Sequence, residues 1–251
     1  MSSSDCAIVT GGASGIGKSL VNRLVQRGVK VVFADISAGP GKEFEAELNK
    51  EGKRALFVEC NVAVEEHLNN LFEVATKEFG GANIVINNAG ITRNEDLGGS
   101  LDYIDDLVQI NLVSVIKGTS LAIQHFKGQN CQEKKKDFNI INIGSILGLR
   151  PEFSAPVYSL TKTAVISFSQ ALGYLADIGI RVNCIAPCFI DTNLMKDIQK
   201  SSLDVLVQSR GGYMDVSLVE KAFCHLLDNK ELVGEVYEVD PAHIGLIPKA
   251  K

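Results

Sequence analysis

Two side chains with complementary acid–base chemistry stand one helical turn apart in the second half of the chain. Tyr158 and Lys162 lie within the stretch from Pro156 to Asp177, whose apolar spacing predicts a helix that presents both on one face. Ser145 lies at the end of the strand-like segment from Asn139 to Ile143, separated from it by one residue. A surface pair is the alternative interpretation of Tyr158 and Lys162 alone. Because open α/β sheets bind ligands where their strands end, Ser145 favours a catalytic constellation.

A tyrosine, a lysine and a serine together can move a proton to or from an alcohol oxygen. A free tyrosine has a pKa of about 10, too high for an efficient base near neutrality. A neighbouring ammonium group, and the positive nicotinamide ring of a bound dinucleotide, would stabilise the phenolate and lower that pKa. Tyr158 would then accept the hydroxyl proton as hydride leaves the carbon, while Ser145 hydrogen-bonds the same oxygen. These residues predict hydride transfer between an alcohol and a carbonyl.

The amino-terminal segment carries the features of a dinucleotide site. Thr10-Gly-Gly-Ala-Ser-Gly-Ile-Gly17 joins a strand-like segment to a helical one. Glycines in such a turn let the backbone approach a pyrophosphate, and the helix N-terminus offers free N–H groups. An ordinary strand-to-helix corner is the alternative. The residues of this turn that we expect to contact the cofactor are Gly11, Ser14, Gly15, Ile16 and Gly17.

Asp35 ends the next strand-like segment and favours NAD over NADP. A carboxylate about twenty residues after the glycine turn can accept hydrogen bonds from the adenosine ribose, and it repels a 2′-phosphate. Neither Ser14 nor Ile36 supplies a cation that would hold such a phosphate. The alternative for Asp35 is an ordinary acid at a strand end. We therefore expect NAD as the cofactor.

Apolar segments alternate with helical patterns along the whole chain. This alternation predicts a single α/β domain over 1–251, with a Rossmann-like, doubly wound, mostly parallel seven-stranded sheet and helices on both faces. The predicted strands are Ala7 to Thr10, Val29 to Asp35, Ala55 to Cys60, Ile84 to Ile86, Asn139 to Ile143, Arg181 to Ala186 and Glu235 to Val239. The polar stretch 193–212 is long for a connector, so we expect a mobile segment that covers the substrate.

Composition limits the partners and the compartment. The net charge is −5 and no broad basic surface is apparent, so nucleic acid is not expected. The first residues lack the features of a signal peptide, and no apolar run approaches the roughly eighteen residues of a membrane span. We therefore expect a cytoplasmic protein without a membrane partner. The six cysteines form no C-x-x-C pair and the four histidines are scattered, so no metal site is expected.

In their order, these motifs resemble the short-chain dehydrogenase/reductase family. The resemblance runs from about residue 5 to residue 245. It rests on Thr10-Gly-x-x-x-Gly-x-Gly17, Asn87-Asn-Ala-Gly90, Asn111, Ser145, Tyr158-x-x-x-Lys162 and the segment Pro187 to Thr192. Ile110-Asn-Leu-Val-Ser-Val-Ile116, followed by Gly118-Thr119, is most similar to the animal 15-hydroxyprostaglandin dehydrogenases and insect-type alcohol dehydrogenases. The resemblance to that subgroup implies oxidation of a secondary alcohol with NAD.

The resemblance also implies roles for individual residues. Asn111 matches a helix asparagine that helps to anchor a water between Lys162 and a proton relay. The implied cofactor contacts are Asp35, Ile36, Asn61, Val62, Asn88, Ala89, Gly90, Tyr158, Lys162, Pro187, Ile190 and Thr192. Two departures leave substrate size and tail packing open: Cys188 replaces the usual glycine, and Asp240-Pro241-Ala242 replaces Asp-Gly-Gly.

Two long predicted helices, Leu101 to Phe126 and Pro156 to Asp177, carry broad apolar surfaces. In the family such helices pair across a two-fold axis into a four-helix bundle, which implies a homodimer or homotetramer. Burial of both surfaces inside one subunit is the alternative.

The substrate is expected to be a small molecule, an alcohol or its carbonyl. The expected wall consists of Ser145, Ile146, Leu147, Phe153, Ala155, Tyr158 and Phe189. Its apolar members favour a lipid- or terpenoid-like alcohol, although apolar loop residues can simply pack. Arg93 could meet an acidic substrate group, with a surface role as the alternative.

Two other functions remain open. The first is NAD(P)H-dependent reduction of a carbonyl, such as a ketosteroid, a retinoid or a fatty acyl group, which Asp35 disfavours. The second is a dinucleotide-binding scaffold or sensor without turnover. A scaffold has no need of Asn111, Ser145, Tyr158 and Lys162 together.

Overall fold

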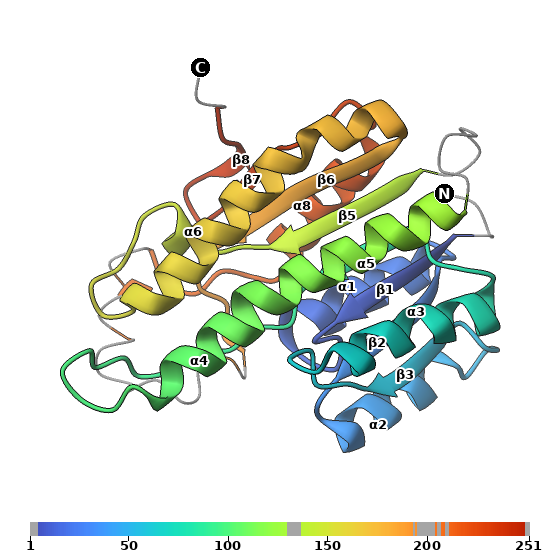
Figure 1. The fold of residues 1–251 in the computed structure, drawn as a ribbon, viewed down its shortest axis with the longest axis horizontal. Helices are drawn as coiled ribbons and strands as arrows, with labels where there is room; N and C mark the ends of the chain where they lie inside the picture. The colour runs from blue at the N-terminus through green and yellow to red at the C-terminus, as the bar shows by residue number, and fades with distance from the viewer. Residues whose placement is uncertain are drawn as a thin grey trace.

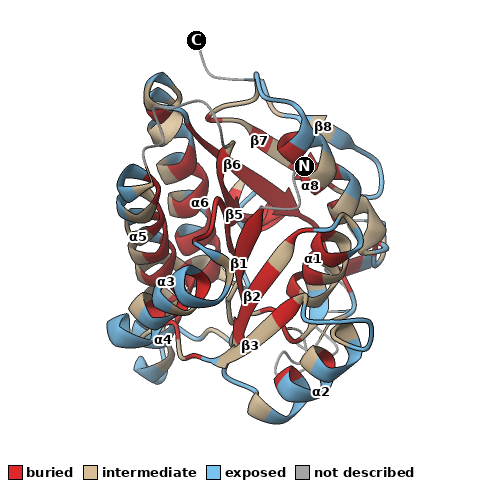
Figure 2. Cartoon of the chain, turned by 90° about the vertical axis from the view of Figure 1, so that its right-hand side faces the viewer, coloured by how far each residue is buried: buried red, intermediate tan, exposed pale blue. Residues whose placement is uncertain are grey.

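Within the described part of the chain, one eight-stranded sheet forms the centre of the molecule, and helices cover both of its faces (Figures 1 and 2). The structure is a computed structural model, and it describes residues 5–129, 137–192, 194, 204, 207–208 and 211–248. The strands are β1 (Cys6–Thr10), β2 (Lys30–Asp35), β3 (Ala55–Glu59), β4 (Ile84–Asn87), β5 (Phe138–Ile143), β6 (Ile180–Pro187), β7 (Val236–Val239) and β8 (Ile244–Leu246). Their order in the sheet is β3-β2-β1-β4-β5-β6-β7-β8.

The strand order reverses between β1 and β4. Strands β1 to β7 are all parallel, and Ile8 in β1 pairs with Val32 of β2 on one side and with Val85 of β4 on the other. The chain therefore winds outward from the centre in two directions, which is the doubly wound, Rossmann-like arrangement that the sequence predicts. A crevice is expected at the carboxyl ends of β1 and β4, because the connections leave to opposite faces there.

The predicted number of seven strands is wrong by one. The additional strand, β8, is antiparallel to β7 and forms the edge of the sheet, with Val239 opposite Ile244. Its three residues are exposed or only partly buried. These three residues, Ile244-Gly245-Leu246, are too few for an apolar run or an alternation that would predict a strand.

Ten helical elements connect and cover the strands in the described ranges. They are α1 (Gly15–Gln26), α2 (Ala38–Leu48), α3 (Glu65–Phe79), α4 (Asp102–Val108), η1 (Gln109–Val113), α5 (Ser114–Gly128), η3 (Ile146–Gly148), α6 (Pro156–Ala171), η4 (Leu172–Ile178) and α8 (Ser217–Asp228). Helices α1, α2 and α8 lie on one face of the sheet, and α3, α5 and α6 lie on the other (Figure 2).

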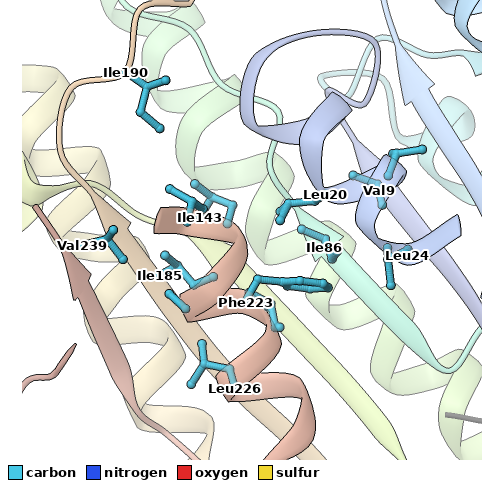
Figure 3. Close-up of a cluster of buried hydrophobic side chains, with 14 of the residues drawn as sticks. Val9, Leu20, Leu24, Ile86, Ile143, Ile185, Ile190, Phe223, Leu226 and Val239 are labelled. Carbon is cyan, nitrogen blue, oxygen red and sulfur yellow. The ribbon is translucent and has the colours of Figure 1, made fainter. Parts of the chain in front are cut away.

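Helical spacing of apolar residues fixes each helix against the sheet. In α1, Leu20 and Leu24 are buried one turn apart, and in α8 Phe223 and Leu226 are buried in the same way. Figure 3 shows these four side chains gathered with strand residues such as Ile86 in one apolar cluster. Burial of each such side chain contributes roughly 1.5–3 kcal/mol to the stability of the folded state. This apolar layer therefore holds α1 and α8 against the sheet.

The first long predicted helix is continuous but not uniform. Residues 102–128 pass from α4 through the π-helix η1 into α5, and Asn111 lies in the π-helical turn. An 18-residue window of this helix has a mean hydropathy of 1.2, and the helix is long and apolar enough to cross a membrane by length and composition alone, although no such run is expected from the sequence. Core helices can have the same length and composition; here 39% of the window is buried, and α5 packs against α3, β4 and β5. The second long predicted helix is α6 followed by the 3₁₀ helix η4.

A chain of buried polar side chains ties α5 and α6 to the sheet. Asn87 Nδ2 donates to Thr119 Oγ1 at 3.1 Å and to Asn142 Oδ1 at 2.8 Å, and Asn142 Nδ2 donates to Ser169 Oγ at 2.9 Å. Gly118 lets α5 approach this chain, because a Cβ atom there would lie 2.4 Å from Asn87 Oδ1. Buried polar groups are costly unless they are paired, so the chain fixes which helix faces which strand.

We expect Gly118→Ala to lower the free energy of unfolding by about 1–3 kcal/mol, because the added methyl group overlaps Asn87. Gly128→Ala in the same helix is the matched control, since a Cβ atom there has no neighbour within 4 Å. The control should change stability by less than about 1 kcal/mol. Urea unfolding of both variants measures the difference, and equal effects would show that the contact with Asn87 is unimportant.

Candidate active site

A cavity of about 750 Å³ opens at the carboxyl ends of the parallel strands. Its wall includes Gly11 after β1, Asp35 at the end of β2, Asn88 after β4, Ser145 after β5 and Pro187 at the end of β6. Asn61, shortly after β3, lines it as well, so six strands end at this cavity, and it occupies the place where the strand order predicts a ligand.

The glycine turn at one end of the cavity depends on backbone shapes that side chains disfavour. Gly11 and Gly15 have positive φ angles of 64° and 51°. A Cβ atom at Gly17 would lie 2.0 Å from the carbonyl oxygen of Gly11. Asn88 Nδ2 also donates to that oxygen at 3.0 Å, which joins the turn to the end of β4. The turn is therefore a fixed cradle of backbone atoms in front of the N-terminus of α1.

Asp35 and Ile36 form the outer part of the same wall. Asp35 Oδ2 accepts a hydrogen bond from the backbone N–H of Ala13 at 3.1 Å, and Oδ1 accepts one from Ser37 N–H at 3.0 Å. An ionised carboxylate has about four acceptor positions, so both oxygens can still accept from ligand hydroxyls. Ile36 is 67% exposed and presents an apolar surface beside them.

Tyr158 and Ser145 meet on the opposite wall of the cavity. Tyr158 lies in the first turn of α6 and is 7% exposed, and Ser145 stands at the start of η3. Burial raises the pKa of Tyr158 to about 12, while a side-chain hydrogen bond with Ser145 opposes this rise. The sequence predicts that the Lys162 ammonium group and a bound nicotinamide ring together lower this pKa. In the structure, desolvation of the phenolate dominates and raises it.

Lys162 is buried one turn further along α6. Its Nζ atom donates to the carbonyl oxygen of Ile143 at 2.9 Å and lies 5.7 Å from the centre of the Tyr158 ring. Burial lowers the pKa of Lys162 to about 8. A pKa of about 8 still leaves most of the amine protonated at neutral pH. Lys162 therefore places a positive charge beside the tyrosine.

Asn111 lies behind the wall rather than on it. Its Oδ1 atom accepts from Ile91 N–H at 2.8 Å, and its Nδ2 atom donates to Ile91 O at 2.8 Å. A Cβ atom at Gly90 would lie 3.3 Å from Asn111 Oδ1 and 3.6 Å from Lys162 Nζ. Gly90 therefore lies close to both side chains. The structure thus shows Asn111 holding the segment after β4. The implied role in anchoring a water stays a prediction.

Most residues selected from the sequence line this one cavity. They are Gly11, Ser14, Gly15, Ile16, Asp35, Ile36, Asn61, Val62, Asn88, Ala89, Gly90, Ser145, Ile146, Leu147, Ala155, Tyr158, Lys162, Pro187, Phe189, Ile190 and Thr192. Gly17 is not part of the cavity wall, but it lets the glycine turn adopt its close packing against Gly11. The structure brings the residues together, and their individual roles remain predictions.

Phe153 requires a correction. Its side chain is 94% exposed and does not line the cavity, so its predicted place on the substrate wall is wrong. Its backbone N–H is bonded to Glu152 Oε1 in the irregular turn before α6, and the ring points outward. Of the stretch 193–212, only Leu194, Asp204, Val207, Gln208, Gly211 and Gly212 belong to the described residues. The predicted mobile segment therefore lies largely outside the described residues.

Several cavity residues have no signal in the sequence. Ile91, Thr92, Asn94 and Glu95 all line the cavity, although they lie in an irregular segment that has no periodicity. Glu95 also accepts hydrogen bonds from Val157 N–H and Tyr158 N–H. Contacts between residues that are more than sixty positions apart cannot be read from local spacing.

The chain is similar to known oxidoreductases over nearly its whole length. The sequence profile of the short chain dehydrogenase family matches residues 5–203. The chain is 31% identical to 15-hydroxyprostaglandin dehydrogenase [NAD(+)] of Bos taurus, over 93% of this chain and 90% of that protein. It is 32% identical to 3beta-hydroxysteroid dehydrogenase 2 of Eggerthella lenta, over 82% of this chain and 79% of that protein.

A solved structure of an oxidoreductase has the same fold. The crystal structure of 3-ketoacyl-(acyl-carrier-protein) reductase from Brucella melitensis, complexed with NADH, superimposes with a TM-score of 0.84 at 26% identity. The superposition covers 94% of this chain and 96% of the reductase. The chain therefore belongs to the short-chain dehydrogenase family and is an oxidoreductase. This confirms the resemblance that the motifs indicate.

The buried lysine should make stability depend on pH in a defined window. The pKa of Lys162 is lowered from 10.5 to about 8 in the folded protein. Between these values the unfolded lysine binds a proton that the folded one has lost, so stability rises with pH. Relative to Lys162→Met, the wild type should gain about 1 kcal/mol per pH unit between pH 8 and pH 10.

Urea unfolding of both proteins at several pH values tests this expectation without any ligand. Other titrating groups, such as Cys184 and Tyr158, are present in both proteins, so their contributions largely cancel in the difference. Parallel stability curves for the two proteins would show that Lys162 titrates normally.

Proposed function

We propose that this protein is an NAD-dependent dehydrogenase that transfers a hydride from an apolar alcohol, lipid- or terpenoid-like, to NAD. One observation carries the proposal. The Tyr158–Ser145 pair, with Lys162 behind it, faces the same cavity as the glycine turn and Asp35. The residues that can transfer a proton and the turn that can hold a dinucleotide therefore line the same cavity.

The cofactor is proposed from the chemistry of the wall. The glycine turn at α1 suits a pyrophosphate, and the carboxylate of Asp35 suits the two hydroxyls of an adenosine ribose. Among the described lining residues, the cations are Arg93 and Lys162. Neither belongs to the Asp35–Ile36–Ser37 corner, so nothing described there would hold a 2′-phosphate. A bound nicotinamide ring would supply the hydride acceptor.

The protein's own residues would hold the alcohol and remove its proton. Ser145 and Tyr158 would both hydrogen-bond the alcohol oxygen, which fixes its position. Tyr158 would accept the hydroxyl proton, and the Lys162 ammonium group would stabilise the phenolate during oxidation. The carbonyl of Ile143 holds Lys162 Nζ in place for this role.

The rest of the wall supports the proposed substrate class. Its apolar part consists of Ile91, Ile146, Leu147, Ala155, Cys188, Phe189 and Leu194. This surface suits a hydrocarbon better than a sugar. Relatives named for prostaglandin and hydroxysteroid oxidation fit the same class.

Carbonyl reduction is the second candidate, and one observation favours it. With its pKa raised to about 12, Tyr158 is protonated at neutral pH and so is ready to donate a proton to a carbonyl. A relative is named carbonyl reductase family member 4 of Xenopus tropicalis. Asp35 weighs against this candidate where the reductant is NADPH. Oxidation should accelerate as pH rises and reduction should slow, because the two directions need opposite protonation states of Tyr158.

The cofactor and the substrate can be tested in one set of measurements. Titration with NAD and NADP should show at least about tenfold tighter binding of NAD, the ratio that about 1.4 kcal/mol of charge repulsion gives. Absorbance of the reduced cofactor is then followed with secondary alcohols, terpenols, hydroxysteroids and hydroxy fatty acids. In Asp35→Ser the preference should weaken. Tighter binding of NADP to the wild type would contradict the assignment of Asp35.

Tyr158→Phe tests the proposed acid–base role. The variant should lose about 10²- to 10⁴-fold in kcat, the usual contribution of a positioned proton acceptor. Its dissociation constant for NAD should stay within a few-fold of the wild type, because the ring remains. A variant that retains more than half of the wild-type kcat would exclude Tyr158 as the base.

We also propose that the protein forms a homodimer or homotetramer through the long helices. Ile116 on α5 and Leu160 on α6 are apolar and exposed, and Leu160 is exposed by 64%. Helices α5 and α6 both lie on the outside of one face of the sheet (Figures 1 and 2). A second copy that covers these positions would remove them from water.

A further inference from the structure

The irregular segment between β4 and α4 is fixed to two different helices. At its start, the backbone of Ile91 is bonded on both sides to the Asn111 side chain, at 2.8 Å each. Four residues later, the Glu95 carboxylate reaches the first turn of α6. The segment therefore bridges the helix that carries Asn111 and the helix that carries Tyr158.

Helix α6 has no side-chain cap of its own. Its N-cap residue is Ala155, which makes no capping hydrogen bond, and Pro156 occupies the first helical position. The N–H groups of the first turn are unpaired within a helix unless another group accepts them. Here Glu95 Oε2 accepts from Val157 N–H at 2.6 Å and Oε1 accepts from Tyr158 N–H at 2.8 Å. The cap comes from a residue more than sixty positions earlier in the chain.

Glu95 also belongs to the wall of the cavity that Tyr158 faces. The charged side chains among the described lining residues are Asp35, Arg93, Glu95 and Lys162. Asp35 lies at the dinucleotide corner, so Glu95 is the carboxylate bonded next to the tyrosine. One of its oxygens accepts a hydrogen bond from the backbone N–H of Tyr158 itself. A displacement of Glu95 would therefore move the backbone of Tyr158.

We propose that Glu95 is a positioning residue for Tyr158: its carboxylate fixes the first turn of α6 and so sets where the tyrosine hydroxyl meets the substrate oxygen. This inference rests on the proposed function of Tyr158. Glu95 acts through the backbone and takes no proton from the substrate. A misplacement of about 1 Å at a reacting group can cost about 100-fold in rate, so a cap at this position has a direct kinetic consequence.

The charge of Glu95 gives the proposal a second, independent signature. A helix N-terminus is positive and favours an anion nearby, and a carboxylate bound there offsets that field. Removal of the negative charge should therefore favour the Tyr158 phenolate. The acidic limb of the pH profile of kcat/KM for oxidation should move to lower pH in Glu95→Ala and in Glu95→Gln. Asp96→Ala, which removes a carboxylate of the same segment that is bonded to Gly98 N–H, should leave that limb unchanged.

The experiment compares Glu95→Ala, Glu95→Gln and Asp96→Ala with the wild type. Asp96 is the matched control, because it is a carboxylate in the same segment, bonds to Gly98 N–H in its own turn and does not line the cavity. We expect Glu95→Ala to lose about 10- to 100-fold in kcat while KM and the NAD dissociation constant change less than about threefold. Glu95→Gln keeps one acceptor oxygen and should recover part of this loss. Asp96→Ala should behave as the wild type.

Hydrogen exchange of the Val157 and Tyr158 amides separates this inference from the proposed function. Exchange should be faster in Glu95→Ala than in the wild type and Asp96→Ala, whether or not a substrate is known. Unchanged exchange, or a kcat within about twofold of the wild type, would overturn the role of Glu95. Wild-type protein that turns over no alcohol or carbonyl would instead overturn the proposed function, and the exchange rates would still decide whether Glu95 caps α6. Should Glu95→Ala fail to fold, Glu95→Gln supplies the same comparison.

Discussion

The architecture depends on the close contact between the chain after β1 and the chain after β4. Asn88 Nδ2 donates to the carbonyl oxygens of Thr10 and Gly11, and Thr10 Oγ1 accepts from the N–H groups of Asn88 and Ala89. These bonds lock the glycine turn to the point where the strand order reverses. The turn then has one shape, and the cavity in front of it has a fixed floor.

The neighbouring residue performs the complementary task on the other face of the sheet. Asn87 is directed to Thr119 on α5 and Asn142 on β5, while Asn88 is directed to the turn. Successive side chains of a strand point to opposite faces, so two adjacent asparagines serve two different layers. The position of the glycine turn is therefore coupled to the position of the helices that carry Asn111 and Tyr158.

Burial determines the electrostatics of the proposed catalytic residues. Desolvation raises the pKa of Tyr158 and lowers that of Lys162, so at neutral pH the tyrosine is protonated while most of the lysine keeps its positive charge. A positive ring beside them would reverse the balance for the tyrosine, because it favours the phenolate. Under the proposed function, Tyr158 would become an effective base only with the dinucleotide bound beside it.

The fold and the centre of the site were predictable because their signals are local. The alternation of apolar strands with helical spacing determines the parallel sheet, and glycines with a following Asp35 mark the cradle through short-range geometry. Tyr158 and Lys162 are four positions apart on one helix, so their common face follows from helical geometry. The carboxyl end of β5 then brings Ser145 to them, as parallel strand ends share one edge.

The remaining features depend on contacts that local patterns do not encode. The strand β8 is too short and too exposed to show periodicity, and the π-helical turn contains Asn111, whose side chain bonds Ile91 twenty positions away. Phe153 was predicted on the substrate wall as an apolar loop residue, but its side chain is 94% exposed. Glu95 was missed because its partners lie on a helix that is distant in sequence.

The most direct test of the central claim is a crystal structure of the protein with NADH and the carbonyl product of the best alcohol. The account predicts that the carbonyl oxygen lies within about 2.6–3.2 Å of both the Tyr158 hydroxyl and Ser145 Oγ. It also predicts that the adenosine ribose contacts Asp35. A product oxygen placed away from Tyr158, or a dinucleotide bound outside the glycine turn, would contradict the account.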